Sequence, residues 1–453
     1  MAVNSGFIPR SVRSVRPWLN RLRAQFVDVP LLGWLAGGLV AVLLEQLVGP
    51  YLAYALGMSK IPVLFGFSIA LNDPVLFPSA VVYVLLIYVL PIALVAKLTA
   101  SLANRAATWL LGVSLVVSVL VHLGLLYAVL HIWAKGPVSV DYRDLVARMT
   151  LVAVMLTLSL NVVNGYMGEF SCSHPGFMAL GAYMASIFTV VLFVQDNTFG
   201  APILPPGLGF FMFPVGLVLA GFISAVGALL VAVPSFRTRG DYLAIISLAF
   251  MFIIKSLFEN LQFVGGARGL GGQPNWATLP IVFLWAVLCI WTINNFVRST
   301  MGKALNAVRD GELAADAMTV DTRRTKMIAF LFAAFWAGLA GGLFAHVLGY
   351  VNPGTFDLKK LAEVLAMVYL GGLNSVVGSI VGAVSYTLLG EALRPLELWK
   401  WIIIPVLLIL VMIFRPTGLI AFREFDVKKL LRPRTAGSGA GTGSTEPPSE
   451  QGR

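Results

Sequence analysis

Charged residues are scarce in this sequence: Asp, Glu, Lys and Arg make up 12% of its 453 residues, whereas a soluble domain has about 25%. Hydrophobic residues make up 58% of the chain. This composition excludes intrinsic disorder for most of the chain, since disorder requires low hydrophobicity and high net charge. It also argues against a soluble enzyme, because so much apolar surface could not be hidden from water. The mean hydropathy of +0.87 therefore predicts an all-α polytopic membrane protein.

Cysteine and histidine are also rare. The chain has two cysteines, Cys172 and Cys289, and four histidines that lie far apart in the sequence. It contains no CxxC pair, no HExxH motif and no other metal-ligand spacing. It also has no GxxxxGK[ST] loop for binding nucleotide phosphates. We therefore expect no metal, no cofactor, no ATP site and no enzymatic activity in this chain.

Lysine and arginine outnumber the acids and give a formal net charge of +11. In a soluble protein this excess would indicate nucleic-acid binding, but in a membrane protein it marks the cytoplasmic loops. Residues 1–28 and 415–434 together supply eight of the eleven net charges. An Arg-rich start could also be a transit peptide. The apolar stretch that follows is long enough to span a bilayer. We therefore predict that residues 1–28 are an uncleaved cytoplasmic segment rather than a transit peptide.

Ten apolar stretches are long enough to cross a bilayer as helices, which takes about 20 residues each. They are residues 29–48, 75–96, 106–133, 149–165, 175–194, 208–234, 241–258, 276–297, 327–350 and 396–414. Glycines interrupt the apolar region that follows residue 357, which predicts a broken pair of short helices, 358–371 and 376–393. Residues 51–70 contain lysine, proline and glycine and predict an interfacial or re-entrant segment.

The charge pattern predicts the topology. If residue 1 is cytoplasmic and each stretch crosses once, the Lys- and Arg-rich loops all fall on the cytoplasmic side, as do both termini. The segment 166–174 has no Lys or Arg, so it could instead be a break inside the membrane. Small residues recur at every fourth position in 334–342 and 378–382, a spacing typical of close helix packing. We expect this packing to lie within the chain rather than between two copies.

Ionisable residues within the apolar stretches are functional candidates. Lys255 and Glu259 are four residues apart and could pair on one helix face. Glu363 follows Lys360 by three residues, which favours a local ion pair near a helix end over a proton relay. An ion-coupled carrier would need a buried acid near the bilayer centre, or a broken polar helix in each of two repeats. The sequence shows no such symmetric pair.

The longest polar connection within the folded region is residues 298–326. It is rich in helix formers, and Gly311 predicts a division into two short helices. From Lys303 to Lys326 the loop carries five Lys or Arg and four Asp or Glu. Small residues with charges of both signs at the rim suit docking onto another protein. A solvated amphipathic linker would show the same spacing.

Several blocks of the sequence carry a resemblance to a known family. The run MGKALNAVRDGELAADAMTVDTRRTKMIAF (301–330) resembles the coupling loop of the LivM-like permeases, which are membrane subunits of ABC importers for branched-chain amino acids. Further blocks follow in the family's order: PGFMALGAYMAS (175–186), GDYLAIISLAF (240–250), GGARGLGG (265–272), AGLAGGLFAHVLGYVNPGTF (337–356), VLAMVYLGGLNSVVGSIVGA (364–383) and FRPTGLI (414–420). The resemblance covers roughly residues 145–420, and residues 1–144 carry no motif of this family.

The resemblance implies the fold and function of an ABC importer permease in a bacterial inner membrane. Implied partners are ABC ATPase subunits, a second homologous permease and an external substrate-binding protein. The implied domains are the cytoplasmic segment 1–28, an extra membrane region 29–144, the permease core 145–420 and a basic tail 421–453, disordered from about residue 435. Relatives that carry urea or short amides share much of this pattern, so these substrates remain an alternative, as does an ion-coupled carrier.

In such importers the loop inserts a short helix into a cleft on the ATPase. The positions that match this helix are Arg309, Asp310, Glu312, Ala314, Ala315 and Asp316. Small alanines allow a deep fit, Glu312 could cap or pair with a basic rim, and Arg309 offers a bidentate fork. The family usually has glycine where this chain has Thr319, which makes a tight left-handed turn after the short helix less expected.

The most polar span predicts the translocation path. Asn161 and Asn164 share a helix face, and a buried amide costs several kcal/mol unless it is hydrogen-bonded. They must therefore face protein or a water-filled path, and with Gly165 and Ser171 they are our candidates for its lining. Three glycines of the block 265–272 are candidates for an outer gate or a docking rim, although a surface loop with a permissive backbone would look the same. They are Gly265, Gly266 and Gly269.

Overall fold

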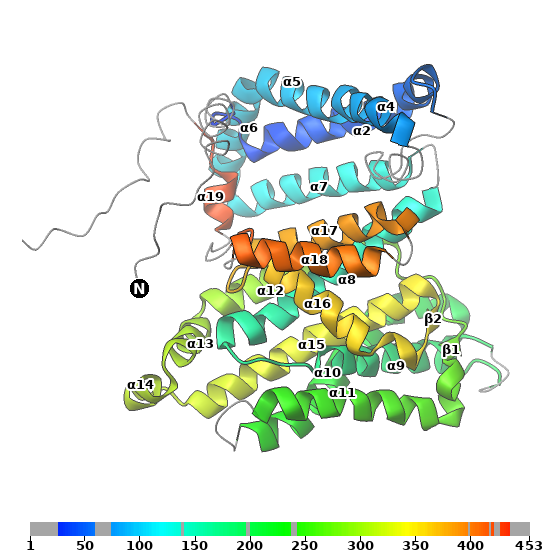
Figure 1. The fold of residues 1–453 in the computed structure, drawn as a ribbon, viewed down its shortest axis with the longest axis vertical. Coiled ribbons are helices and arrows are strands. Elements are labelled where there is room, and N and C mark those ends of the chain that lie inside the picture. Colours follow the sequence, from blue (N-terminus) through cyan, green and yellow to red (C-terminus); the bar gives the residue numbers. More distant parts are fainter. Residues whose placement is uncertain are drawn as a thin grey trace, which may run out of the picture. The chain divides into compact units, whose positions relative to one another are not determined.

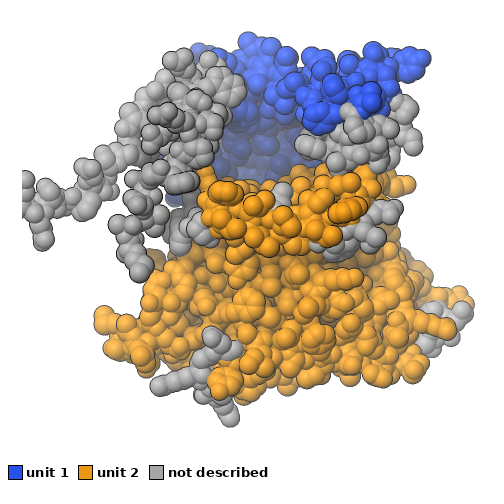
Figure 2. Space-filling model, viewed as in Figure 1, with its two compact units in different colours: residues 1–66, 75–138, 426–453 blue, residues 67–74, 139–425 orange. Residues whose placement is uncertain are grey.

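The computed structural model describes residues 26–58, 74–136, 140–195, 200–236, 242–396, 399–415, 418–420 and 426–434. Three predicted features lie wholly or partly outside these residues: most of the segment 1–28, most of the interfacial segment 51–70, and the tail from residue 435. Contacts divide the chain into two compact units (Figure 2). Unit 1 comprises residues 1–66, 75–138 and 426–453, and unit 2 comprises residues 67–74 and 139–425.

Helices are the only regular secondary structure among the described residues of unit 1 (Figure 1). Its elements are α2 (Leu31–Ala55), α4 (Phe77–Val84), the π-helix η3 (Leu85–Val89), α5 (Leu90–Leu98), α6 (Ala100–Val113), α7 (Leu115–Ala134) and α19 (Val427–Leu431), and a 3-10 turn η2 (Pro74–Leu76) precedes α4. The predicted span 106–133 is divided in the structure, because Ser114 adopts extended backbone and its side chain caps α7 by accepting from the N–H of Val116. A capping hydroxyl ends one helix and starts the next.

Unit 2 holds the longest helices and a two-residue strand pair. Its first part contains α8 (Val140–Asn161), the π-helix η4 (Val162–Met167), α9 (His174–Phe193), α10 (Pro206–Ser235), α11 (Tyr242–Asn260), the 3-10 turns η5 (Gln262–Val264) and η6 (Gly266–Arg268), and β1 (Leu270–Gly271). Its second part contains α12 (Leu279–Arg298), α13 (Thr300–Asp310), α14 (Glu312–Ala317), α15 (Thr322–Leu348), β2 (Tyr350–Val351), η7 (Pro353–Thr355), α16 (Leu358–Gly371), α17 (Val376–Ala392), η8 (Arg394–Leu396) and α18 (Lys400–Phe414).

Nine helices among the described residues are long and apolar enough to span a membrane. They coincide with nine of the ten predicted stretches, and the all-α polytopic fold is confirmed. The tenth stretch, 396–414, corresponds to α18, which has 15 residues. The broken pair after residue 357 is also confirmed, because α16 ends at Gly371 and α17 begins at Val376.

The core of unit 2 is built where α9, α10 and α15 lie side by side (Figure 1). Gly181 of α9 lies directly against the carbonyl of Gly338 on α15, and Gly341 lies against the carbonyl of Met178. A side chain on Gly338 would instead meet Ser224 of α10. In lipid, helix association depends on such close packing, since apolar burial gives little advantage there. The predicted packing within the chain is confirmed for this face.

The helices α16 and α17 form a hairpin whose arms touch through glycine. Gly371 packs on the carbonyl of Gly378, and Gly382 packs on the carbonyl of Met367. Ser375 caps α17, accepting from the N–H of Gly378 at 3.0 Å. The N–H groups of Leu419 and Ile420 donate to the carbonyls of Leu370 and Gly371 at 3.0 and 2.9 Å. The turn of this hairpin is therefore held by a segment beyond α18.

Gly181 should tolerate no side chain. Gly181→Ala would push its methyl group into the backbone of α15, and overpacking of this kind costs about 1–3 kcal/mol. We expect a lower thermal unfolding midpoint for the purified variant in detergent. Gly207→Ala is the control, because a methyl group there would meet no atom within 4 Å. Equal midpoints for the two variants would contradict the close α9–α15 contact.

Candidate functional site

The 298–326 loop folds into two short helices, as predicted. Ser299 caps α13 by accepting from the N–H of Gly302, and Asp321 caps α15 by accepting from the N–H of Arg324 at 2.9 Å. Gly311 has extended backbone and separates α13 from α14. Figure 1 shows α14 projecting at the margin of unit 2. The loop is thus an ordered helical element rather than an extended linker.

The short helix α14 ends in a tight left-handed turn at Thr319, whose φ is 66°. The N–H of Val320 donates to the carbonyl of Ala315, and the N–H of Thr319 donates to the carbonyl of Asp316. These two bonds form a Schellman motif with Thr319 at the position that glycine usually takes. Because Thr319 replaces the usual glycine, the sequence made a left-handed turn less expected here, and that expectation was wrong. The hydrogen bonds of the loop hold a β-branched residue where its backbone is strained.

Lys326 joins the loop to the body of unit 2. Its ammonium lies 2.6 Å from a carboxylate oxygen of Glu169 and 2.9 Å from one of Glu312. The side chain of Lys326 is only 9% exposed. A cation so buried needs both partners to offset its lost hydration. Glu312, predicted to cap a helix or to pair with a basic rim, pairs with Lys326 of its own chain in this structure.

Arg309 makes a second connection at the same end of unit 2. One terminal nitrogen donates to the carbonyl of Gly165 at 3.3 Å, and the guanidinium also bonds Asp310 at 2.8 Å. The side chain stem of Arg309 packs on Gly168, where no Cβ would fit. Gly168 has a φ of 77° and ends the π-helix η4. The fork of Arg309 thus holds the backbone at the break after α8.

Two exposed apolar side chains, Leu313 of α14 and Met318 at its C-cap, were missed by sequence reasoning. Leu313 and Met318 are each 77% exposed, whereas Ala315 is buried. Ala314 and Asp316 are exposed on the same short helix. The signal was present in the sequence, because a six-residue helix anchored through Ala315 and Glu312 must turn its remaining large side chains outward.

Residues 168–173 are not helical, and Ser171, Cys172 and Ser173 among them are buried. Buried backbone polar groups outside a helix need hydrogen-bond partners from protein. The N–H of Ser171 donates to the side-chain oxygen of Asn164 at 3.2 Å, and the N–H of Cys172 donates to the hydroxyl of Ser247 at 2.8 Å. Ser171 also shares a hydrogen bond with Ser173 at 2.9 Å. Within the segment that the sequence left open as a loop or a break, Gly168 and Phe170 are exposed and the residues from Ser171 onward are buried, and its place relative to the membrane stays a prediction.

The thiol of Cys172 belongs to this segment and lies outside the nine candidate spans. Burial raises the pKa of Cys172, and the hydrogen bond from the neighbouring Ser247 lowers it by less. The thiol therefore stays protonated at neutral pH and packs as a small apolar side chain. Its contacts are with Met251 and Leu361.

Asn161 links the end of α8 to the α16–α17 hairpin. Its amide nitrogen donates to the carbonyl of Ser375 at 3.1 Å and to the hydroxyl of Ser379 at 2.7 Å. Its amide oxygen accepts from the N–H of Asn374 at 3.2 Å. Asn374 has a φ of 57°, a conformation that asparagine tolerates better than most residues. One buried amide thus holds the turn of the hairpin.

The four path candidates are gathered around η4. Asn161, Asn164 and Ser171 are buried, and Gly165 packs on Asn161 and on the backbone of Asn374. The structure therefore brings all four together, and it places them between the 298–326 loop and the hairpin. A π-helix of six residues at this point is typical of a functional site.

The glycine block 265–272 is an ordered turn in the structure. Gly265, Gly266 and Gly269 have positive φ values of 86°, 53° and 83°. A side chain on Gly269 would meet the carbonyl of Val351 on β2. The strand β1 pairs antiparallel with β2, with Leu270 opposite Val351. These glycines are thus required by the backbone, and their role as a gate or docking rim stays a prediction.

The predicted ion pairs near helix ends are present. Lys255 lies 4.0 Å from Glu259 and 3.8 Å from Asp357. Lys360 lies 2.7 Å from Glu363. Within the described part of the chain, no group of three His, Cys, Asp or Glu side chains could hold a metal ion.

Comparison with known proteins points in one direction. A family model described as "Branched-chain amino acid transport system / permease component" matches residues 142–414. The high-affinity branched-chain amino acid transport system permease protein LivM of Salmonella typhimurium is 32% identical over 339 residues, covering 67% of this chain and 76% of the relative. LivM of Escherichia coli is 31% identical over 318 residues, covering 62% and 71%. LivH of Salmonella typhimurium is 25% identical over 290 residues, covering 60% and 92%. No solved structure matches the chain.

Thr319→Gly should stabilise the protein. Glycine adopts the left-handed conformation without the cost of about 1–2 kcal/mol that other residues incur, although its greater freedom in the unfolded chain offsets part of this gain. We expect an unfolding free energy higher by about 1 kcal/mol, seen as a higher thermal midpoint. Thr322→Gly, in the first turn of α15, should instead destabilise by a few tenths of a kcal/mol up to about 1 kcal/mol. A destabilised Thr319→Gly variant would contradict the strained turn.

Proposed function

This chain belongs to the family of branched-chain amino acid transport system permease components, and from that premise we propose that it is the membrane permease subunit of an ABC importer for branched-chain amino acids. It forms the translocation pathway with a second homologous permease. ATPase subunits supply the energy in trans, and an external binding protein delivers the substrate. The charge pattern supports a topology with both termini in the cytoplasm, which puts α13 and α14 on the ATPase side.

The main support for this proposal is that α14 is anchored at its base and exposes apolar side chains. Leu313 and Met318 protrude from it, while Lys326 and Arg309 tie its base to the membrane part. Apolar side chains on an anchored projection fit the cleft of a partner protein, where a few buried residues provide most of the binding energy. Exposed Asp316 and Asp310 lie at the rim of this surface and suit a basic partner.

The same connections explain how ATP hydrolysis could reach the pathway. A shift of α14 acts on Glu169 through Lys326 and on Gly165 through Arg309. Both belong to the break after α8, and Asn161 joins that break to the α16–α17 hairpin. ATPase closure that displaces α14 would therefore bias the position of the hairpin turn. Such a ligand shifts an equilibrium only by its different affinity for the two states.

The exposed side chains of Leu313 and Met318 should decide whether the ATPase subunits bind. Leu313→Asp together with Met318→Asp places charges in the proposed cleft, and we expect at least tenfold less ATPase to co-purify with the permease. Leu313→Met is the matched control, since this swap keeps volume and polarity. Full co-purification with the double variant would exclude α14 as the docking helix.

The anchors of the loop should matter for coupling rather than for docking. Replacing Arg309 by Ala and Glu312 by Gln leaves Leu313 and Met318 in place but removes the connections to Gly165 and Lys326. We expect the assembled complex in proteoliposomes to hydrolyse ATP while leucine uptake falls at least tenfold. Lys303→Met, which removes an exposed charge from α13, should leave uptake unchanged. Normal uptake in the Arg309/Glu312 variant would show that these two residues do not couple ATP hydrolysis to transport.

A separate measurement tests the substrate and the energy source. Leucine and valine uptake should be lost when the partner ATPase is inactivated. Uptake that persists without ATP hydrolysis would indicate an ion-coupled carrier. Uptake of urea or short amides in place of leucine would show that the substrates are these compounds and not branched-chain amino acids.

A further inference from the structure

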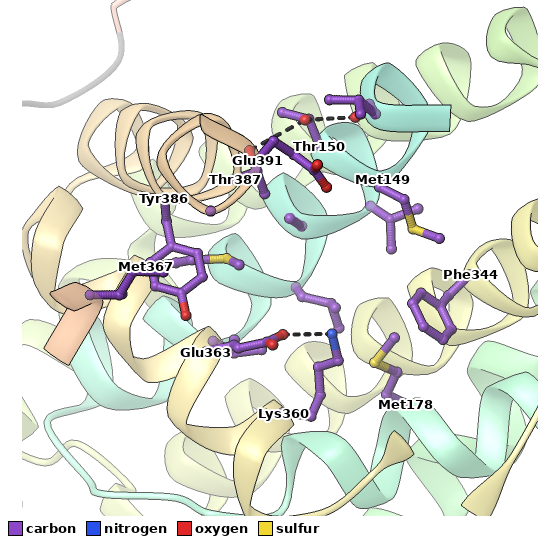
Figure 3. Close-up of a pocket in the computed structure, with 17 residues that line it drawn as sticks. Met149, Thr150, Met178, Phe344, Lys360, Glu363, Met367, Tyr386, Thr387 and Glu391 are labelled. Atoms are coloured by element: carbon purple, nitrogen blue, oxygen red, sulfur yellow. Dashed lines mark hydrogen bonds and ion pairs between the residues drawn. The ribbon is translucent and has the colours of Figure 1, made fainter. Parts of the chain in front are cut away.

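A cavity of about 270 Å³ lies within unit 2, between α8, α16 and α17 (Figure 3). Met178 of α9, Phe344 of α15 and Ile404 of α18 close it. This volume is far larger than the space that a single water molecule needs, so the cavity has room for a compact organic molecule.

The wall of the cavity is mostly aliphatic and thioether. Its apolar lining comprises Val146, Met149, Val152, Ala153, Leu156, Met178, Phe344, Val364, Met367 and Ile404. Flexible methionines let such a wall adapt to side chains of slightly different shape. This lining is suited to a branched aliphatic group, whose burial contributes about 0.8 kcal/mol per methylene.

Polar side chains interrupt the apolar wall, namely the ion pair of Lys360 with Glu363 and, elsewhere on the wall, Glu391, Tyr386, Thr150 and Thr387. The ammonium of Lys360 lies 2.7 Å from the carboxylate of Glu363, and their side chains are 20% and 25% exposed. The ammonium also lies 5.4 Å from the centre of the Phe344 ring. Figure 3 shows the pair pointing into the cavity, with Met178 and Phe344 on one side and Met367 and Tyr386 on the other. Both charges are thus held at one place on the wall.

The ammonium of Lys360 and the carboxylate of Glu363 can each form further hydrogen bonds to a second partner. An ammonium has three donors and a carboxylate accepts at about four sites, and the bond between Lys360 and Glu363 uses one of each. A molecule with a carboxylate beside an ammonium can bond both at once, and these charge-assisted bonds are strong away from water. A zwitterion can bond both charges without adding net charge to the cavity, whereas an anion or a cation would leave one charge uncompensated.

We propose that this cavity is a substrate-binding station in which Lys360 bonds the carboxylate and Glu363 the ammonium of an α-amino acid, with its aliphatic side chain against Val364, Leu156 and Met367. This proposal rests on the proposed function and names the residues that would recognise the substrate. The hydroxyls of Thr150 and Thr387, 3.3 Å apart, face the same cavity. They offer further hydrogen bonds to the polar end of the ligand.

A second cavity of about 350 Å³ adjoins the first and shares Val146, Met149, Gly390 and Glu391 with it. Tyr142 donates to Glu391 at 2.6 Å there, and Arg394 lies 3.8 Å from the same carboxylate. Glu391 of α17 and Arg394 of η8 thus bring both signs of charge to this second cavity. By the proposed topology this second cavity lies toward the external side, so it would give the zwitterion a polar approach to the station.

The cavity is also connected to the break after α8. Lys360, Glu363 and Met367 lie on α16, and Thr387 lies on α17. These are the two arms of the hairpin whose turn Asn161 holds. A movement of that turn would change the distance between the arms and thus the fit of the cavity to its ligand.

The test uses the full complex of permeases, ATPases and binding protein in proteoliposomes, with radiolabelled L-leucine. Lys360→Met and Glu363→Gln should each reduce initial uptake at least tenfold while ATP hydrolysis shows that the complex is assembled. The exchanged pair, K360E with E363K, keeps the intramolecular ion pair but reverses its direction, and should stay at least tenfold impaired. Wild-type uptake in the exchanged variant would show a structural pair only and overturn the proposal.

Two further measurements complete the design. Lys359→Met removes the same charge from the neighbouring position of α16, which does not line the cavity, and should retain wild-type uptake. Val364→Ala shortens a side chain of the aliphatic wall and so enlarges the cavity. It should shift the ratio of leucine to valine uptake at least threefold toward leucine, which is the larger substrate. An unchanged ratio would overturn the station even if the charge variants fail to assemble. Absence of leucine uptake by the wild-type complex would instead contradict the proposed function.

Discussion

Backbone groups that leave a helix inside an apolar environment must still be hydrogen-bonded, and unit 2 is organised around that constraint. At the end of α8 the chain passes through the π-helix η4 and a non-helical segment whose residues 171–173 are buried. Asn164 and Ser247 accept hydrogen bonds from this segment, because its buried N–H groups need partners from protein. A second break, in the α16–α17 hairpin, is satisfied by Asn161 in the same way. The two breaks are therefore held together by one short stretch that runs from the end of α8 into η4.

This arrangement gives the 298–326 loop its connection to the interior. Arg309 bonds a carbonyl at the first break, and Lys326 bonds Glu169 just beyond it while also holding Glu312 of α14. Charges that could have served a partner are thus used within the chain. What remains exposed on α14 includes the apolar Leu313 beside the acidic Asp316, and this division of roles is what a transmitting element needs: attachments inward and an exposed contact outward.

Much of the fold could be predicted from composition and spacing. Nine spans, the division at Gly311, the broken pair after residue 357 and the pairing of Lys255 with Glu259 all follow from local rules on length, glycine and helix-face spacing. The boundary at Ser114 was missed, because an apolar run conceals a single capping residue. Thr319 was misjudged for a related reason: a motif predicts which residue prefers a left-handed turn, but neighbouring hydrogen bonds can impose that turn on another residue.

The candidate site shows the same limit more clearly. Asn161 and Asn164 could be recognised as buried amides that need partners, because their cost in an apolar span depends only on their chemistry. Which groups satisfy them could not be recognised, since Ser375 and Ser379 lie more than two hundred residues away along the chain. The sequence by itself thus determined a multi-pass helical membrane protein with a mixed-charge loop, since hydropathy and charge act locally. Only the tertiary structure decided that Glu312 faces Lys326, that Leu313 faces outward, and that Lys360 and Glu363 share an apolar cavity, because these depend on which helices pack together.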